Sequence, residues 1–363
     1  SFKFRVRKFM KLFKSLLVAP ATLGLLAPMA ASANEVTIND FNAAEEIAVT
    51  NSRVDGLEAR FNDLEAGGFS DTTTASFGVD FLIGAVDGAS TEATQFSYQM
   101  GIGLESSFTG DDLLSATIDI GNASGVVGGS TGLNFDNTSD ALTLDGLTYT
   151  FPVGDAATVM VGDNTDISAV YTGACAYSSF TDYMGNCGTG NSVGVGGNGV
   201  TAAMAYAFDS GFSLAGGVSS TPTSILTEEG TDTFGLEAAY TSDDYGLSVA
   251  YADAESTTYW GVNGMYAFDF ITLSAGVESE DPTSGSTKTG FFVGLSFPEV
   301  GEGSLDLGIG TAANYASSDT EYYIYEASYS YPINDGMTIT PGVYIREGST
   351  DETGFAVKTS FSF

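Results

Sequence analysis

The sequence predicts a closed transmembrane β-barrel of about sixteen antiparallel strands, preceded by a short heptad helix. Three observations predict this fold. Short segments of apolar–polar alternation fill the chain from residue 69 to residue 363. The charged side chains within those segments all share the parity of the small and polar residues. The last segment alternates Phe355, Val357, Thr359, Phe361 and Phe363, so it closes on an aromatic residue.

The composition requires a large apolar surface in spite of a strongly acidic charge. The 363 residues are 43% hydrophobic, include 25 Phe and 18 Tyr, and carry a formal net charge of −35. A membrane-spanning helix needs about 20 consecutive apolar residues, and no such run follows residue 33. If the chain crosses a membrane, it must therefore cross as strands.

Residues 1–33 have the order of a secretory signal peptide. An apolar run over residues 16–29 is followed by the small residues 31–33, which offer a cleavage site before Asn34. Pro20 and Pro28 interrupt the run, which argues against a short membrane anchor. Met10 begins a more typical signal sequence than Ser1 does, so the nine residues before it would be an upstream extension or the result of a misassigned start site. The run is preceded by the basic residues Arg5, Arg7, Lys8, Lys11 and Lys14.

Removal of residues 1–33 makes the chain still more acidic. Six of the 11 basic residues leave and no acidic residue does, so five basic and 46 acidic residues give a net charge of −41. Such a chain repels nucleic acid and anionic surfaces and concentrates cations around itself. Binding to DNA or RNA is therefore excluded.

Residues 34–68 are predicted to contain a short periplasmic helix. One seam of its heptad pattern holds Ile47, Val54 and Phe61, and the other holds Thr50, Leu57 and Leu64. Gly67 and Gly68 end it. With under three heptads the helix is marginal alone. It would form a small parallel coiled coil between subunits, or act as a solitary plug or linker.

Residues 69–363 are predicted to form the barrel. Sixteen alternating segments can be laid out, an even number as closed bacterial barrels require: residues 72–86, 95–108, 113–122, 141–152, 156–163, 199–208, 212–219, 233–242, 246–253, 257–268, 271–279, 287–297, 304–312, 320–331, 337–346 and 353–363. Short and long connections alternate between them, which predicts short turns on the periplasmic rim and long loops outside. Both ends of the barrel would then lie in the periplasm.

The parity of the charges distinguishes this barrel from a soluble β-sandwich. A charge facing lipid near the bilayer centre costs about 2 to 4 kcal/mol. The charges on the small-residue face, expected to line the lumen, are the acids Asp80, Glu105, Asp119, Glu237, Glu278, Asp306 and Glu326 and the bases Lys288, Arg346 and Lys358. None lies on the aromatic face, so that face is predicted to contact outer-membrane lipid.

Four segments resemble the cyanobacterial outer-membrane porins, which are related to the carbohydrate-selective porin family. They are residues 108–114 (Phe-Thr-Gly-Asp-Asp-Leu-Leu), 149–155 (Tyr-Thr-Phe-Pro-Val-Gly-Asp), 331–337 (Tyr-Pro-Ile-Asn-Asp-Gly-Met) and 54–60 (Val-Asp-Gly-Leu-Glu-Ala-Arg). The resemblance implies a trimeric sixteen-strand porin that passes ions and small solutes without energy input. Many relatives carry an S-layer-homology domain before the helix, whereas only residues 34–44 remain here, so a tethering role is in doubt. The closing Phe363 resembles the signal read by the barrel-assembly machinery.

The residues give little support to an enzyme. The mature chain has no His, which removes Ser-His-Asp chemistry and makes a zinc site improbable. A carboxylate pair for glycoside hydrolysis is compatible with the composition, yet no cluster stands out from the general acidity. A calcium site at Asp136 and Asp140 competes with the simpler interpretation of solvated acids. We expect no cofactor and no bound metal.

The connection over residues 163–198 is the candidate constriction. It holds both cysteines of the chain, Cys175 and Cys187, which are expected to pair in an oxidising compartment. A stiffened loop of this length is expected to fold into the lumen, with a stapled external loop as the alternative. Its acids, Asp163, Asp166 and Asp182, would face wall bases, of which Lys358 lies nearest mid-strand.

These features predict a cation-selective diffusion channel. The barrel segment carries three basic against 38 acidic residues. A carbohydrate-selective channel would need an aromatic track, but only Phe292, Tyr322 and Tyr344 have inward parity. A structural or adhesion barrel would fill its lumen with bulky side chains, whereas the inward set here is mostly Gly, Ser, Thr and Ala.

Overall fold

The computed structural model describes residues 73–363 apart from residues 90–91, 123–132, 134, 136–137 and 196–198. The expected signal peptide and heptad helix lie outside the described residues. No helix in the described part of the chain is long and apolar enough to cross a membrane.

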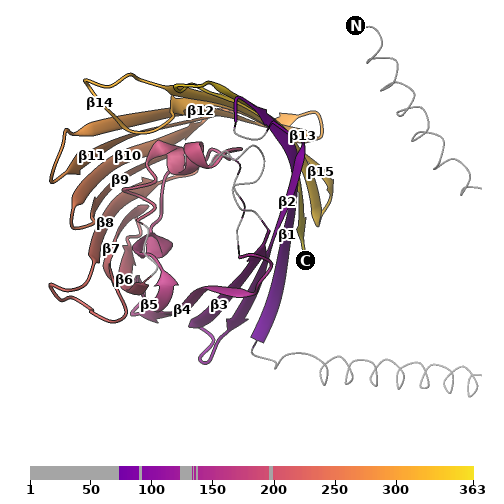
Figure 1. The fold of residues 1–363 in the computed structure, drawn as a ribbon. Helices are drawn as coiled ribbons and strands as arrows, with labels where there is room; N and C mark the ends of the chain where they lie inside the picture. The colour runs from indigo at the N-terminus through magenta and orange to yellow at the C-terminus, as the bar shows by residue number, and fades with distance from the viewer. Residues whose placement is uncertain (1–72, 90–91, 123–132, 134, 136–137, 196–198) are drawn as a thin grey trace, which may run out of the picture. The chain divides into compact units, whose positions relative to one another are not determined.

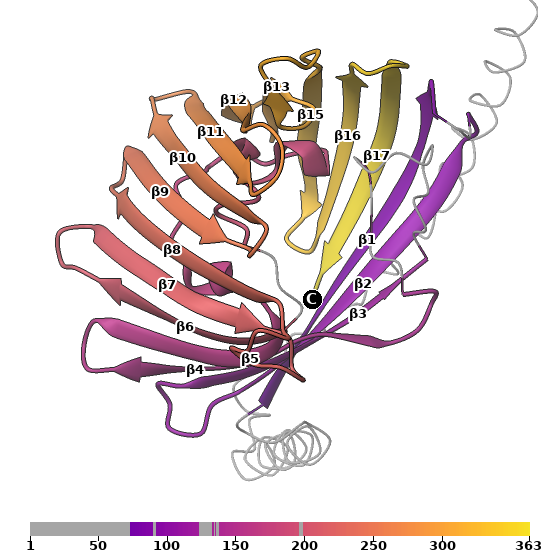
Figure 2. The ribbon, with the colours of Figure 1, turned by 60° about the vertical axis from the view of Figure 1, so that its left-hand side comes forward.

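Sixteen long strands close into one antiparallel barrel, as the alternation predicts (Figures 1 and 2). Each strand pairs with the next along the chain, and β1 pairs with β17 to close the ring. A further two-residue strand, β14 (Tyr315–Ala316), lies in a loop and pairs with the start of β12. The long strands are β1 (Thr73–Asp87), β2 (Gln95–Ser106), β3 (Leu113–Gly121), β4 (Thr143–Val153), β5 (Ala157–Thr165), β6 (Gly199–Ala207), β7 (Phe212–Ser220), β8 (Asp232–Thr241), β9 (Tyr245–Asp253), β10 (Thr257–Ala267), β11 (Thr272–Pro282), β12 (Lys288–Val300), β13 (Gly303–Thr311), β15 (Tyr323–Asn334), β16 (Met337–Arg346) and β17 (Glu352–Ser362).

Alternation along each strand separates the two faces of the wall. On β8, Phe234 and Leu236 are 50% and 63% exposed, whereas Glu237 and Ala239, which have the opposite parity, are each 3% exposed. An apolar surface that stays exposed around a closed barrel is the surface that lipid covers. The described barrel therefore turns its aromatic and aliphatic side chains outward.

Aromatic rings gather on the outer face at the rim that carries the short turns. Neighbouring strands contribute successive contacts: Tyr206 with Phe208, Phe212 with Tyr240, Tyr240 with Tyr245, Tyr245 with Tyr266, and Tyr266 with Phe268, at centroid distances of 4.6 to 6.5 Å. Such rows of rings are typical of the interface between hydrocarbon and water. They mark one edge of the membrane-embedded band.

Both ends of the barrel lie at this same rim. The Phe363 backbone exchanges hydrogen bonds of 2.8 and 3.0 Å with Phe77, and their rings stack 5.7 Å apart. The amide of Ser362 also donates to Gly336, in the short turn between β15 and β16. The arrangement of short turns and chain ends thus agrees with the expected alternation of connections.

One of the short turns is organised by a single buried carboxylate. Between β2 and β3, Asp112 accepts hydrogen bonds from the backbone N–H groups of Phe108 and Thr109 at 2.9 and 2.8 Å. The hydroxyls of Ser107 and Thr109 donate at 2.8 Å, and that of Tyr149 on β4 donates at 2.7 Å. The Tyr149 hydroxyl, with these other donors, holds the pKa of Asp112 well below its usual range.

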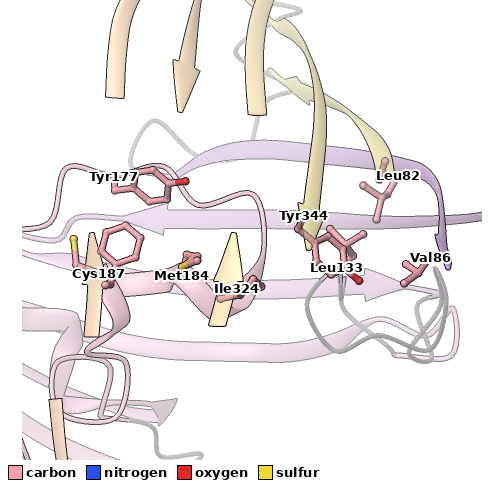
Figure 3. Close-up of a cluster of buried hydrophobic side chains, with 10 residues drawn as sticks. Leu82, Val86, Leu133, Tyr177, Met184, Cys187, Ile324 and Tyr344 are labelled. Carbon is pink, nitrogen blue, oxygen red and sulfur yellow. The ribbon is translucent and has the colours of Figure 1, made fainter. Parts of the chain in front are cut away.

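The largest buried apolar cluster lies inside the ring rather than between layers (Figure 3). It joins strand residues to residues of two long connections. Tyr177, Met184 and Cys187 come from the connection after β5, and Leu133 comes from the connection after β3. The strands contribute Leu82, Val86, Phe292, Ile324, Tyr344 and Ala356. Part of the lumen is therefore packed like a protein core.

Candidate functional site: the lumen and its inward loop

Residues 166–195, here called the inward loop, lie against the inner face of the wall (Figures 1 and 2). The loop contains two short 3₁₀ helices, η4 (Ile167–Val170) and η5 (Asp182–Gly188). Ile167, Met184 and Cys187 are no more than 1% exposed. The loop therefore packs against the wall with buried side chains, and burial of Ile167 and of Met184 contributes about 1.5 to 3 kcal/mol each.

A row of wall glycines makes room for the loop. A Cβ atom added at any of these glycines would come within 3.0 Å of a loop atom. Each of six strands contributes one such glycine. The glycines of β8, β10 and β11 lie against Tyr171, Ser192 and the carbonyl of Cys187. Those of β12 and β13 lie against Tyr177, and that of β16 lies against Phe180. The glycines, here called the glycine track, are Gly235, Gly261, Gly276, Gly294, Gly308 and Gly342.

Three wall glutamates receive hydrogen bonds from the loop. Glu237 on β8 accepts from the backbone N–H groups of Thr172 and Gly173 at 2.7 and 3.0 Å. Glu326 on β15 accepts from those of Phe180 and Thr181 at 2.9 and 3.0 Å.

The third glutamate, Glu278 on β11, accepts from the backbone N–H of Ser192 at 2.8 Å and from the side-chain amide of Asn191 at 2.7 Å. The three carboxylates are 1 to 4% exposed. Glu237, Glu278 and Glu326 therefore have the expected inward parity but lie beneath the loop, away from the open lumen.

Cys175 and Cys187 form a disulfide in the structure, with their Cα atoms 5.7 Å apart. The bridge closes a ring that contains Tyr177, Phe180 and Thr181. These residues contact the wall at β12, β13, β15 and β16. The disulfide thus lies within the part of the loop that packs on the wall.

The three acids expected at the constriction are not brought together. Asp163 pairs across the ladder with Leu147, which is 41% exposed on the lipid-facing side, so Asp163 faces away from the lumen. A bulge between Gly162 and Thr165 separates it from the loop. Asp166 begins η4 and lines a polar hollow with Thr117 and Thr148. Asp182 is exposed at the start of η5.

The remaining inward acids line two different parts of the wall. Asp306 is 4% exposed and accepts from the Ser296 hydroxyl at 2.5 Å. Asp80, Glu105 and Asp119 lie on β1, β2 and β3, where the inner face is open enough for Asp80 and Asp119 to be half-buried and Glu105 to be exposed. On this part of the wall, inward carboxylates therefore remain accessible to solvent.

The three basic residues differ in their partners. Lys288 pairs with Glu280 at 3.0 Å, and Arg346 pairs with Glu352 at 3.7 Å. The Arg346 guanidinium also lies 5.0 Å from the centre of the Tyr183 ring of the inward loop. No ion pair of Lys358 occurs among the described residues. It lies half-buried on the inner face of β17, opposite the buried Leu82 of β1.

Neither the glycine track nor the packing role of the inward aromatics was predicted from the sequence. Phe292 and Tyr344 are each 1% exposed, and the Phe292 ring lies 4.8 Å from that of Tyr177. Phe292 packs the loop onto the wall, and Tyr344 belongs to the same buried cluster. The available signal was the recurrence of glycine at inward positions of strands that follow the loop in the chain.

No group of three or more metal-ligating side chains that could hold a metal ion occurs within the described residues. Of the two acids considered for calcium, Asp136 lies outside the described residues. Asp140 accepts a hydrogen bond from the Tyr98 hydroxyl at 2.6 Å.

Two uncharacterized proteins are similar to this chain in sequence. No protein-family model matches the chain. An uncharacterized protein of Nostoc sp. is 25% identical over 90% of this chain and 70% of its own length. Another uncharacterized protein, of Synechocystis sp., is 29% identical over 95% of this chain and 77% of its own length.

Solved structures share the fold at low sequence identity. The high-pH structure of Pseudomonas putida OprB matches with a TM-score of 0.63 and 13% identity over 80% of this chain and 94% of that one. A loop-deletion mutant of OmpT, an outer membrane protein of Vibrio cholerae, matches with a TM-score of 0.61 and 10% identity over 81% of this chain and all of that one. A mutant Rh. blastica porin matches with a TM-score of 0.55 and 15% identity over 80% of this chain and all of that one. This chain is therefore a sixteen-strand outer-membrane β-barrel with the fold of the porins.

Proposed function

We propose that this protein is a porin through which cations and small polar solutes diffuse across the outer membrane. The observation that carries the proposal is the contrast between the two sides of the lumen. The inward loop covers the wall from β8 to β16, while β1 to β3 present reachable carboxylates at Asp80, Glu105 and Asp119. A channel of this kind needs no catalytic group.

The charge of the barrel supports a preference for cations. The barrel segment contains 38 acidic and three basic residues. Two of the three basic residues form ion pairs. A confined negative field raises the local concentration of cations and excludes anions, with screening over about 8 Å at physiological salt. The preference should therefore weaken as salt rises.

A planar-bilayer recording tests this function. The wild-type protein should give discrete channels whose reversal potential, in a gradient of dilute potassium chloride, reports cation preference. Asp182→Asn should reduce that preference, whereas Asp163→Asn should leave it unchanged because Asp163 faces outward. Anion preference would refute cation selectivity. A wild-type barrel that inserts without conducting would favour the structural or adhesion alternative.

A carbohydrate-selective channel receives less support. Of the three inward aromatics, Phe292 and Tyr344 are each 1% exposed, so neither is available to stack on a sugar. Liposome swelling with sugars of increasing size distinguishes the two. A diffusion channel admits them by size alone, whereas a selective one prefers one sugar among several of equal size.

Assembly of the mature porin would involve three segments. Residues 1–33 would direct secretion, residues 34–68 would associate beside other subunits of a homotrimer, and Phe363 would be read by the barrel-assembly machinery. The pairing of Phe363 with Phe77 at the periplasmic rim supports the last point, because recognition there would coincide with closure of the barrel.

A further inference from the structure

The inward loop carries backbone N–H groups that the wall cannot satisfy with its own backbone. Most of the loop lacks regular secondary structure, so those donors need acceptors. The strands beneath it use their backbone carbonyls in the barrel ladder. Acceptors must therefore come from side chains of the inner wall, and a donor left unpaired in such a buried place is costly.

The three wall glutamates meet this need with both oxygens of each carboxylate. One oxygen of Glu237 accepts from Thr172, and the other accepts from Gly173 and from the Ser248 hydroxyl at 2.7 Å. In Glu326, one oxygen accepts from Phe180 and from the Tyr177 hydroxyl at 3.0 Å, and the other accepts from Thr181.

Glu278 shows the same use of both oxygens. One accepts from Ser192, and the other accepts from the side-chain amides of Asn191 and of Asn314 at 2.7 and 2.9 Å. No basic side chain pairs with any of the three among the described residues. Their partners are neutral donors, most of them supplied by the loop.

We propose that Glu237, Glu278 and Glu326 are positioning residues that fix the inward loop on the glycine track and so set the width of the passage. This inference rests on the proposed channel function. The carboxylate form matters because a glutamine of the same shape would turn an NH₂ group toward a donor. The glutamates hold the loop at residues 172–173, 180–181 and 191–192, and the glycine track lets it approach between those points.

Hydrogen–deuterium exchange of the folded, detergent-solubilised protein tests the proposal without requiring ion flow. Loss of one charged acceptor should speed hydrogen exchange about tenfold or more at the backbone amides that donate hydrogen bonds to it. Glu237→Gln should act on the peptide containing Thr172 and Gly173, and Glu278→Gln on the peptide containing Ser192. Glu105→Gln removes the same charge from the inner wall without touching the loop, so it should leave loop exchange unchanged.

The wall itself offers an independent variant. Gly276→Ala places a methyl group against the carbonyl of Cys187 and should speed exchange around residues 187–189. Gly78→Ala is the matched control, because a Cβ atom there meets nothing within 4 Å. Each variant needs only to fold as a barrel, which heat-modifiable migration in electrophoresis reports.

Single-channel recording then links the loop to the passage. The Glu→Gln variants should visit a wider conductance level about tenfold more often than the wild type for each acceptor lost. Unchanged loop exchange in both Glu237→Gln and Glu278→Gln would overturn the proposal, as would faster exchange without any new conductance level. Faster exchange in a protein that carries no current at all would overturn the channel function while leaving the attachment of the loop intact.

Discussion

At the scale of single residues, Asp112 is predicted to stabilise the β2–β3 turn through its ionised form. Its folded-state pKa lies below the unfolded value, so its contribution is fully present above about pH 4 and is lost as the pH falls toward the folded pKa. Asp112→Asn should therefore unfold at lower urea concentration than the wild type at pH 7, and the difference should shrink in acid. Asp111→Asn, an exposed neighbour, is the control. A pH-independent difference would contradict the role of the charge.

A second prediction at the scale of single residues concerns the effect of Lys358 on ion selectivity. Lys358 lies half-buried on the inner face of β17, opposite Leu82 and without an ion pair among the described residues. Lys358→Glu should shift the reversal potential further toward the cation limit, because it replaces a positive charge in the confined passage by a negative one. Lys288→Glu makes the same change at the first residue of β12, where Glu280 already lies 3.0 Å away, and should shift it less. Equal shifts would mean that Lys358 does not lie at the narrowest part.

At the scale of elements, the strands could be predicted from the sequence, but the position of the inward loop on the barrel wall could not. Alternation is local and has a period of two, so strands such as β8 and β9 were delimited to within one residue of the structure. The inward loop depends on contacts more than 60 residues apart, such as Thr172 with Glu237. Inward glycines and glutamates look the same in sequence whether a loop or water lies over them.

Asp163 was misplaced for a different reason. It continues the outward parity of Val159 and Val161 and pairs in register with Leu147, so it belongs to the outer face of β5, whereas Asp166 begins the loop. The strand passes into the loop at a bulge between Gly162 and Thr165, and periodicity does not reveal such a bulge. The sequence therefore located the loop that narrows the lumen but not which of its acids reach the passage.

The disulfide is predicted to stabilise the loop and not the barrel. Mass spectrometry of unreduced protein should find Cys175 and Cys187 linked. Closing a ring of this size contributes about 3 kcal/mol on chain-entropy grounds. Replacing both cysteines by Ala should speed amide exchange between residues 175 and 187 while heat-modifiable migration of the barrel stays as in the wild type. Loss of the folded barrel in that double variant would show that the bridge is needed beyond the loop.

At the scale of the whole molecule, we predict a homotrimer whose stability depends on residues 34–68. A helix with the predicted seam of Ile47, Val54, Phe61 and their partners would be too short to be stable alone and would gain stability by association. Native mass spectrometry in detergent should find three copies of the mature chain. Val54→Asp should lower the trimer fraction, whereas Ser52→Asp, off the seam, should not. Trimers that persist equally in both variants would assign the association to the barrels.

The glycine track has a consequence for how this channel can change by mutation. Glycine is the smallest residue, so any substitution on the track can only add atoms beneath the loop. The closed sheet cannot retreat, because its strands are hydrogen-bonded on both sides. Random change at these positions therefore pushes the loop toward the axis and narrows the passage. A wider passage requires a change in the inward loop, for example a smaller side chain at Tyr177 or a shorter loop. Mutations of the wall glycines can therefore only narrow the passage, whereas mutations of the loop can widen it.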